Sequence, residues 1–195
     1  MLIFKRANIQ YYFQILFNFA VLNVYCFFRL SIIKIKNYTM KYSQLTKEQF
    51  EELHEEFAIF LAAQSIDAKE WEIIKKEKQD LADKELNAFS DFVWEKVLNK
   101  ANYIEHFSKD TLNLFKCNEE GMQRIVVKIK NNEIDLLDEN GFNWFLDNSK
   151  DDSIEYLKGD KKYQKEKNLE IFDLIQQGGV VGDGKLFDAI YKIIR

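Results

Sequence analysis

The sequence predicts a helix-rich α+β fold for residues 40–195, in which a group of three helices precedes a small antiparallel β-meander and C-terminal helices follow it. Apolar residues recur at helical spacing to about residue 99, then alternate as in strands, and return to helical spacing after about residue 163. The chain has no proline and 15% aromatic residues, which is typical of packed elements rather than linkers.

The first predicted helix begins after Thr46, whose hydroxyl can cap it. Gln49 stands three residues later and completes a capping box, while Leu45 and Phe50 occupy the two positions of a hydrophobic staple. The helix then has one apolar face, and its glutamates lie largely off that face. The apolar positions are Phe50, Leu53, Phe57, Phe60 and Leu61.

Two more helices are predicted by the same capping chemistry. Asp67 can cap the second helix, with Glu70 at its third position, and this helix extends to about Lys78. Asp80 is the predicted cap of the third helix, which ends near Asn99. Because the connections are short, we expect the three helices to pack as an antiparallel group.

Three short segments after residue 102 predict the meander. They are 112–117, 125–129 and 134–137, and in the second one apolar side chains alternate between the two faces of a strand. Asn131 and Asn132 suit a hairpin turn between the second and third segments. The sequence therefore predicts an antiparallel sheet against which the helices can pack.

The last third of the chain predicts three helices. A short one follows Gly141 and covers 142–146, and a longer one covers 163–177 with Leu169, Phe172 and Ile175 facing inward. Gly178 is placed to end this helix in a left-handed conformation, which glycine adopts without strain. The final predicted helix covers 185–194.

Residues 1–39 differ in character from the rest of the chain. They contain no Asp or Glu, and only five of the 28 basic residues, so residues 40–195 hold 23 basic and 32 acidic residues and a net charge of −9. The uncharged stretch 9–28 has the length of a membrane span, but Gln10, Gln14, Asn18 and Asn23 weaken it.

Three interpretations of this leader follow. The composition, which changes abruptly at Met40, favours an upstream segment read before the true start. The alternative is a genuine membrane anchor through 9–28. A secretory signal is the third and has less support, because no small-residue cleavage site follows the apolar stretch.

Charge and cysteine content limit the partners and the compartment. An acidic domain repels phosphate backbones, so we expect no nucleic-acid binding, while acidic helix faces could attract a basic protein partner. Cys26 and Cys117 form no Cys-x-x-Cys pair, which gives neither a disulfide framework nor a thiolate zinc site. A reducing compartment, the cytoplasm, fits these observations.

The glycine-rich segment 179–185 matches the Gly-x-x-x-x-Gly-Lys spacing of a phosphate-binding loop. Leu186 stands where a magnesium-binding Ser or Thr is needed, and Asp183 places a negative charge where phosphates would lie. The preceding element is predicted as a helix, not a strand. We therefore expect a glycine-capped helix and a turn here, and assign no nucleotide or other cofactor.

No metal site is predicted. Glu51 and His54 have the Glu-x-x-His spacing of di-iron bundles, but such sites need the motif twice, and His106 has Tyr103 three residues before it. A zinc-protease helix would need a second histidine where Ala58 stands.

Catalytic residues are not predicted either. Cys117 could be a nucleophile with His54 or His106 as its base, yet its strand pattern favours a buried structural thiol. The three tryptophans, Trp71, Trp94 and Trp144, lie on or beside apolar helix stripes, which favours core or rim positions over a partner groove.

Four stretches of sequence carry a resemblance to a known family. They are LTKEQFEELHEEF at 45–57, HFS at 106–108, NLFKC at 113–117 and NLEIFDLI at 168–175. From Met40 to the end, the chain resembles members of a bacterial protein family known only as a domain of unknown function. The resemblance implies that such proteins begin at the position of Met40, and it brings no activity or catalytic residue.

These observations predict a small cytoplasmic interaction or regulatory protein without catalytic activity of its own. One alternative is an enzyme or small-ligand binder whose polar site is assembled from scattered residues, which would need a concave pocket with convergent polar groups. Another is a membrane-tethered interaction domain, which depends on residues 1–39.

Overall fold

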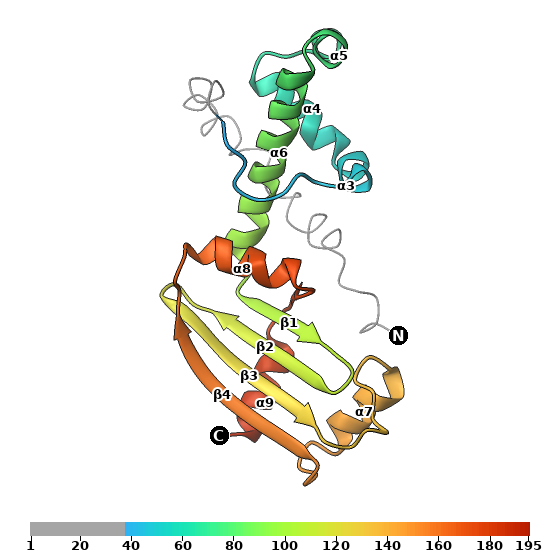
Figure 1. The fold of residues 1–195 in the computed structure, drawn as a ribbon, viewed down its shortest axis with the longest axis vertical. Coiled ribbons are helices and arrows are strands. Elements are labelled where there is room, and N and C mark those ends of the chain that lie inside the picture. Colours follow the sequence, from blue (N-terminus) through green and yellow to red (C-terminus); the bar gives the residue numbers. More distant parts are fainter. Residues whose placement is uncertain (1–37) are drawn as a thin grey trace. The chain divides into compact units, whose positions relative to one another are not determined.

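The computed structural model describes residues 38–195, and over these residues the protein has the predicted α+β fold, with seven helices and one five-stranded antiparallel sheet (Figure 1). Interpretations that concern the leader, including the candidate span 9–28, lie outside the described residues. The described chain divides into two compact units, 38–97 and 98–195. Within 38–195, no helix combines the length and apolar character needed to cross a membrane.

The first unit is helical, and its caps are those the sequence predicts. Helix α3, Lys47–Glu52, begins with a complete capping box. The Gln49 backbone N–H donates to the Thr46 hydroxyl, and the Gln49 side-chain oxygen accepts the Thr46 backbone N–H. Helix α4 is His54–Ala63 and helix α5 is Ala68–Glu77. Asp67 caps α5 by accepting the Glu70 backbone N–H at 2.8 Å.

Two boundaries in this unit differ from the prediction. The predicted first helix is divided at Leu53, whose dihedral angles leave the helical region between α3 and α4. Helix α6 is Gln79–Lys100, so Asp80 lies in its first turn and is not its cap. A single non-helical residue, Lys78, separates α5 from α6, which leaves no room for the longer connection that a cap at Asp80 would need.

An aromatic cluster forms the core of the first unit. Phe89 of α6 is fully buried, and its ring lies 5.0 Å from that of Phe57 and 5.3 Å from that of Phe60. Trp71 of α5 packs edge-on against Phe57 at 5.3 Å. Aromatic pairs at this separation add stability beyond the apolar area that they bury. The apolar face predicted for the first helix is thus the face that packs on α6.

The segment before α3 is attached to α6 mainly through the Asp91 carboxylate, and the Glu95 carboxylate also accepts the Tyr42 hydroxyl at 2.6 Å. Asp91 accepts the Lys41 and Tyr42 backbone N–H groups, at 2.6 and 2.9 Å, and the Tyr38 hydroxyl. Next to it, Ser90 accepts the Leu45 N–H at 3.1 Å. Because this segment has no helical bonds of its own, Asp91 and Ser90 satisfy backbone donors that would otherwise depend on water.

Replacing Asp91 with alanine should release this segment. We expect hydrogen exchange at the Lys41 and Tyr42 amides to become at least tenfold faster, and the unfolding free energy to fall by about 1 kcal/mol, as for the loss of charge-assisted hydrogen bonds at a partly exposed site. The matched control is Asp83→Ala on the same helix, because among the described residues Asp83 bonds only the exposed Gln79 side chain. Equal exchange rates in the two variants would contradict this role of Asp91.

The second unit is built on a sheet with the strand order β4-β3-β2-β1-β5. The strands are β1 Tyr103–Phe107, β2 Thr111–Cys117, β3 Gly121–Ile129, β4 Ile154–Lys162 and β5 Val180–Val181. The predicted strands 112–117 and 125–129 are confirmed as parts of β2 and β3. Strands β1, β4 and β5 were not predicted.

The predicted strand 134–137 and the hairpin at Asn131 and Asn132 are wrong. After β3 the chain enters a loop, and β3 pairs instead with β4 along nine residues of each strand. The apolar pattern in this loop has another cause. Leu136 is 1% exposed and belongs to the core, and its N–H donates to the Lys109 carbonyl at 2.7 Å.

Helices cover the sheet unequally. Helix α7, Glu139–Asp147, and helix α9, Lys185–Ile193, pack on one face, where Phe142, Phe145 and Phe187 contact the inward side chains of β2 and β3. Helix α8, Lys167–Gln176, covers part of the other face (Figure 1). Among residues 38–195, no helix covers most of that second face.

The three helices of this unit are close to the predicted ones. Helix α7 begins earlier than predicted, because Asp138 caps it and Gly141 lies inside it. Helix α8 begins later than predicted, because residues 163–166 form a bend between the end of β4 and the helix. The predicted end at Gly178 is confirmed by its φ of +96°, and α9 agrees with its predicted range to within one residue.

Candidate functional site

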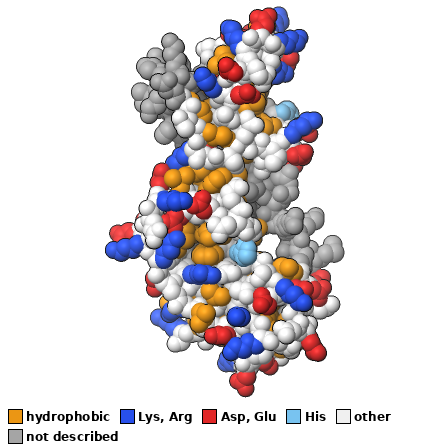
Figure 2. Space-filling model, in the orientation of Figure 1, with side chains coloured by type: hydrophobic (Ala, Val, Ile, Leu, Met, Phe, Trp, Pro, Cys, Tyr) orange, Lys and Arg blue, Asp and Glu red, His pale blue; other side chains and the backbone are white. Residues whose placement is uncertain are grey.

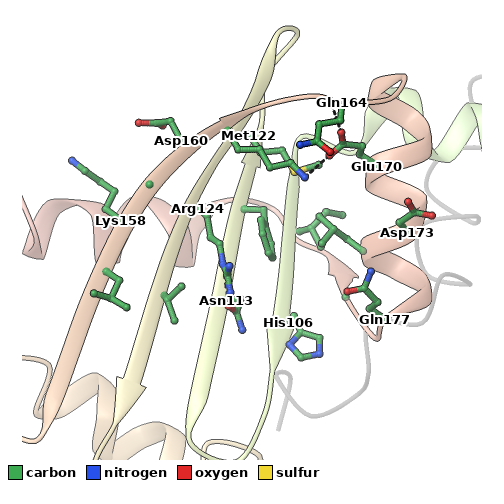
Figure 3. Close-up of a pocket in the computed structure, with 18 of the residues that line it drawn as sticks. His106, Asn113, Met122, Arg124, Lys158, Asp160, Gln164, Glu170, Asp173 and Gln177 are labelled. Carbon is green, nitrogen blue, oxygen red and sulfur yellow. Dashed lines mark hydrogen bonds and ion pairs between the residues drawn. The ribbon is translucent and has the colours of Figure 1, made fainter.

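A groove of about 880 Å³ lies on the sheet face that α7 and α9 leave uncovered. Helix α8 forms one wall, and β4, at the edge of the sheet, forms the opposite rim (Figure 3). Figure 2 shows apolar side chains along the strands of this face, with lysine and arginine side chains around them. The groove lies entirely within residues 98–195.

The groove floor follows from the alternation of the strands. In β2 and β3, Leu114 and Ile125 face the core, so the residues on either side of them face the groove. The register of the sheet then places one groove-facing residue of each strand beside the next. The groove-facing side chains are Ile104, His106, Asn113, Phe115, Met122, Arg124, Val126, Leu157 and Lys161.

Arg124 is the charged group in the middle of the floor. Its Nε and Nη2 atoms donate to the Asn113 side-chain oxygen at 3.2 and 2.5 Å, and its guanidinium lies 5.5 Å from the centre of the Phe115 ring. No carboxylate among residues 38–195 forms an ion pair with it, and its side chain is exposed. A guanidinium has five N–H donors, so donors remain for a ligand.

The wall is fastened to the end of β4 through Glu170. This side chain of α8 is 7% exposed, forms an ion pair with Lys161 at 2.6 Å and accepts the backbone N–H groups of Gln164 and Lys165. Burial disfavours its charged form, but these donors outweigh burial and hold the pKa of Glu170 below its ordinary value. Glu170 and Lys161 thus neutralise each other, and among the described side chains that face the groove floor they leave Arg124 as the unpaired charge.

Two further polar side chains face the groove from opposite elements. The side chains of His106 in β1 and of Gln177, the residue after α8, lie close to each other in Figure 3, and neither side chain forms a hydrogen bond to another described residue. A side chain at Gly178 would contact the His106 ring at 3.6 Å. The His106 and Gln177 donors and acceptors are therefore available to a ligand at this end of the groove.

The arrangement suits binding of an anion that carries an apolar part. The unpaired guanidinium can donate two parallel hydrogen bonds to a carboxylate, and the Phe115 ring, Val126 and Leu157 offer apolar surface beside it. None of the groove-facing side chains is a serine, threonine or cysteine that could act as a nucleophile.

Gly179 lines the groove, and the rest of the glycine-rich segment, 180–185, lies outside the groove lining. It contains β5 and the loop to α9, where Gly184 has a φ of +84°. Asp183 accepts both the backbone N–H and the ammonium of Lys185, at 3.0 and 2.5 Å. The lysine of the apparent phosphate motif is thus paired with the carboxylate beside it. The element before this segment is helix α8, as the sequence predicts, and the short strand β5 lies within the segment.

The candidate metal residues Glu51 and His54 do not share one helix, because the break at Leu53 places them in α3 and α4. The His54 Nδ1 atom lies 2.9 Å from the backbone oxygen of Glu51, not from its carboxylate. Across residues 38–195, no three His, Cys, Asp or Glu side chains gather closely enough to hold a metal ion.

Cys117 is 3% exposed at the end of β2, and burial raises the pKa of its thiol to about 11. The structure does not bring His106 close to Cys117. His106 pairs with Asn113, which is four residues from Cys117 along the strand, a distance of roughly 13 Å.

Trp94 is buried, and its indole N–H donates to the Ser43 carbonyl at 3.0 Å. Trp144 packs against the core cluster of the sheet.

Except for His106, which was weighed as a candidate base, the groove residues were not predicted from the sequence. The alternation around Asn113 and Phe115, and around Arg124 and Val126, was a usable signal, since it places a polar and an apolar side chain on the same face of each strand. This alternation does not show which strand pairs with the free edge of β3. Without β4, the face that holds Arg124 could not be distinguished from a solvated surface.

The fold and the groove define an α+β protein whose antiparallel sheet is covered by helices on one face and presents an open polar groove on the other. Within this class, the chain belongs to the family described as Family of unknown function (DUF6495), whose model matches residues 40–195. This confirms the family resemblance noted from the sequence. No curated protein and no solved structure matches the chain.

Proposed function

We propose that this protein is an interaction module that acts by binding, not by catalysis, and that its groove takes a ligand bearing a carboxylate. The observation that carries the proposal is Arg124, which is exposed at the centre of an 880 Å³ groove without a carboxylate partner among the described residues. Asn113 and Phe115 hold its guanidinium in place, so little ordering is required when the ligand binds.

The location of the protein in the cytoplasm is part of the same proposal, and it rests on the two cysteines that form no paired motif. The basic partner expected from the acidic helix faces concerns a different surface and stays a prediction. The absence of nucleic-acid binding and the membrane-tethered alternative likewise stay predictions.

Phenylacetate is a suitable probe for the groove, because it joins a carboxylate to an apolar ring. We expect it to shift the NMR signals of the Arg124 Nε–H group and of the Phe115 and Val126 amides in a saturable way. For a ligand of this size, the dissociation constant should be roughly millimolar. Phenylacetamide, which has the same shape and no charge, should cause no saturable shift.

The variant Arg124→Gln should weaken phenylacetate binding at least tenfold, because a charge-assisted hydrogen bond contributes about 1.5–3 kcal/mol. Arg195→Gln is the matched control, since Arg195 lies outside the groove lining. If Arg124→Gln binds phenylacetate as the unchanged protein does, or if phenylacetamide binds equally well, the proposed site is wrong.

A further inference from the structure

The charged and apolar parts of the groove floor are spaced regularly along the strands. The sheet register places Arg124 between Phe115 and Gly159, and the next groove-facing row holds Val126 beside Asn113 and Leu157. Two residues of a strand separate these rows, a distance of roughly 6.6 Å. One row of the floor thus carries the positive charge of Arg124, and the next row carries the apolar side chains Val126 of β3 and Leu157 of β4.

An extended polypeptide has the same repeat, because its side chains at positions i and i+2 lie on one face at this spacing. We infer that the groove binds an extended segment of another protein, in which an acidic residue lies two positions from an apolar residue. The acidic side chain pairs with Arg124 while the apolar side chain lies on Val126 and Leu157. This inference rests on the proposed function and specifies its ligand.

The openness of the floor favours a protein segment over a small molecule. Leu157 is 52% exposed and Arg124 is also exposed, and α8 closes the groove from one side only. Small-molecule sites usually bury most of their ligand, whereas a bound peptide leaves one face in solvent. Leu157, on the edge strand, is therefore placed to contact a chain that lies along the groove.

The wall and the adjoining strand β1 offer partners for the backbone of such a segment. Each residue of an extended peptide has an N–H and a C=O that need hydrogen bonds. His106 and Gln177 present donors and acceptors that no other described residue uses. Lys165 and Asp173, on the same wall, are paired at 2.7 Å and leave no unpaired charge there. The selectivity for an acidic side chain therefore comes from Arg124 on the floor.

Gly159 gives a direct way to block the groove without disturbing the fold. It lies beside Arg124 on β4, and a Cβ atom added there meets no atom within 4 Å. In Gly159→Val the new side chain projects into the groove from a strand position that suits valine. Asp160→Val adds the same side chain at the next residue, which faces the opposite side of the sheet and bonds Gln123.

The test is selection of a displayed library of random twelve-residue peptides on the full chain, followed by titration of the enriched peptides. We expect enriched sequences to carry Asp or Glu two positions from an apolar residue. Binding should weaken at least tenfold in Gly159→Val and in Arg124→Gln, and should be retained or strengthened in Asp160→Val. Thermal unfolding of Gly159→Val at or above the temperature of the unchanged protein shows that the loss is not a folding defect.

Four results would overturn the inference. Enriched peptides without the acidic and apolar spacing contradict the ligand class, and peptides insensitive to Gly159→Val bind elsewhere. Binding of phenylacetate without enrichment of any peptide shows a small-molecule groove, so that the proposed function stands and the inference falls. Failure of both phenylacetate and peptides to bind removes the inference and the proposed function together.

Discussion

Gly141→Ala should lower the free energy of unfolding by about 2–4 kcal/mol, because the new methyl group has no space. Gly141 is buried in α7, and an added Cβ atom would lie 2.0 Å from the carbonyl oxygen of Asp135. The obstacle is backbone, which cannot rotate away as a side chain does. The methyl group must therefore displace either the loop at Asp135 or the start of α7, whose Phe142 and Phe145 belong to the core.

Chemical denaturation of the two proteins measures this effect. Gly159→Ala is the matched control, since an added Cβ atom there contacts nothing, and it should leave stability unchanged or slightly raised. If Gly141→Ala lowers the free energy of unfolding by less than about 0.5 kcal/mol, as ordinary surface substitutions do, the loop moves freely. This result would contradict the close approach of Gly141 to the Asp135 carbonyl.

Helix ends could be predicted because their chemistry is local. The capping box of Thr46 and Gln49, the Asp67 cap and the left-handed Gly178 all lie within three residues of the helix end that they fix. The divided first helix shows the limit of this information. Its apolar face is continuous in sequence through Leu53, yet the backbone leaves the helical region there.

Strand pairing depends on residues far apart, and there the prediction was incomplete. Strand β4 ends in Lys158, Gly159, Asp160, Lys161 and Lys162, which are all exposed, so it lacks the alternation that marked β3. An edge strand needs only one row of hydrogen bonds and tolerates such residues. Leu136 caused the opposite error, the prediction of a strand at 134–137. Its side chain is apolar because it is buried in the core, although its backbone belongs to a loop.

The groove depends on these same long-range pairings. Arg124 gains its surroundings from Asn113 eleven positions earlier and Gly159 thirty-five positions later. The first of these contacts belongs to a hairpin whose two strands were predicted, whereas the second requires β4. The sequence could therefore predict the contact between Arg124 and Asn113, but not the rim of the groove that β4 supplies.

Glu105 is expected to make the stability of the protein depend on pH. Its side chain lies on the core face of β1 against Gly182, where an added Cβ atom would meet the Glu105 Oε1 atom at 2.6 Å. It forms no hydrogen bond or ion pair with another described residue. Burial, together with the nearby negative charge of Asp183, raises the pKa of Glu105 to about 7 from an ordinary value of 4.5.

The direction of the effect follows from the bound proton. Between pH 4.5 and 7 the folded protein keeps a proton on Glu105 that the unfolded chain has already lost. The stabilisation from this proton is complete below about pH 4.5 and is lost as the pH rises through about 7. Above that pH, folding must bury a charged carboxylate without a partner.

Glu105→Gln removes this charge, and the variant should be more stable than the unchanged protein by about 2 kcal/mol at pH 8. A pKa shift of one unit corresponds to about 1.4 kcal/mol, and we reduce the full value because Glu105 is partly exposed and because the amide also needs hydrogen bonds. Near pH 4.5 the two proteins should have nearly equal stability. Denaturant titrations at half-unit steps from pH 4.5 to 8 measure the difference, and a constant difference over this range would contradict the assignment to Glu105.

Asp183→Asn provides the second comparison, since it removes the neighbouring negative charge. Its gain in stability at pH 8 should be smaller than that of Glu105→Gln, because burial is the larger cause of the raised pKa of Glu105.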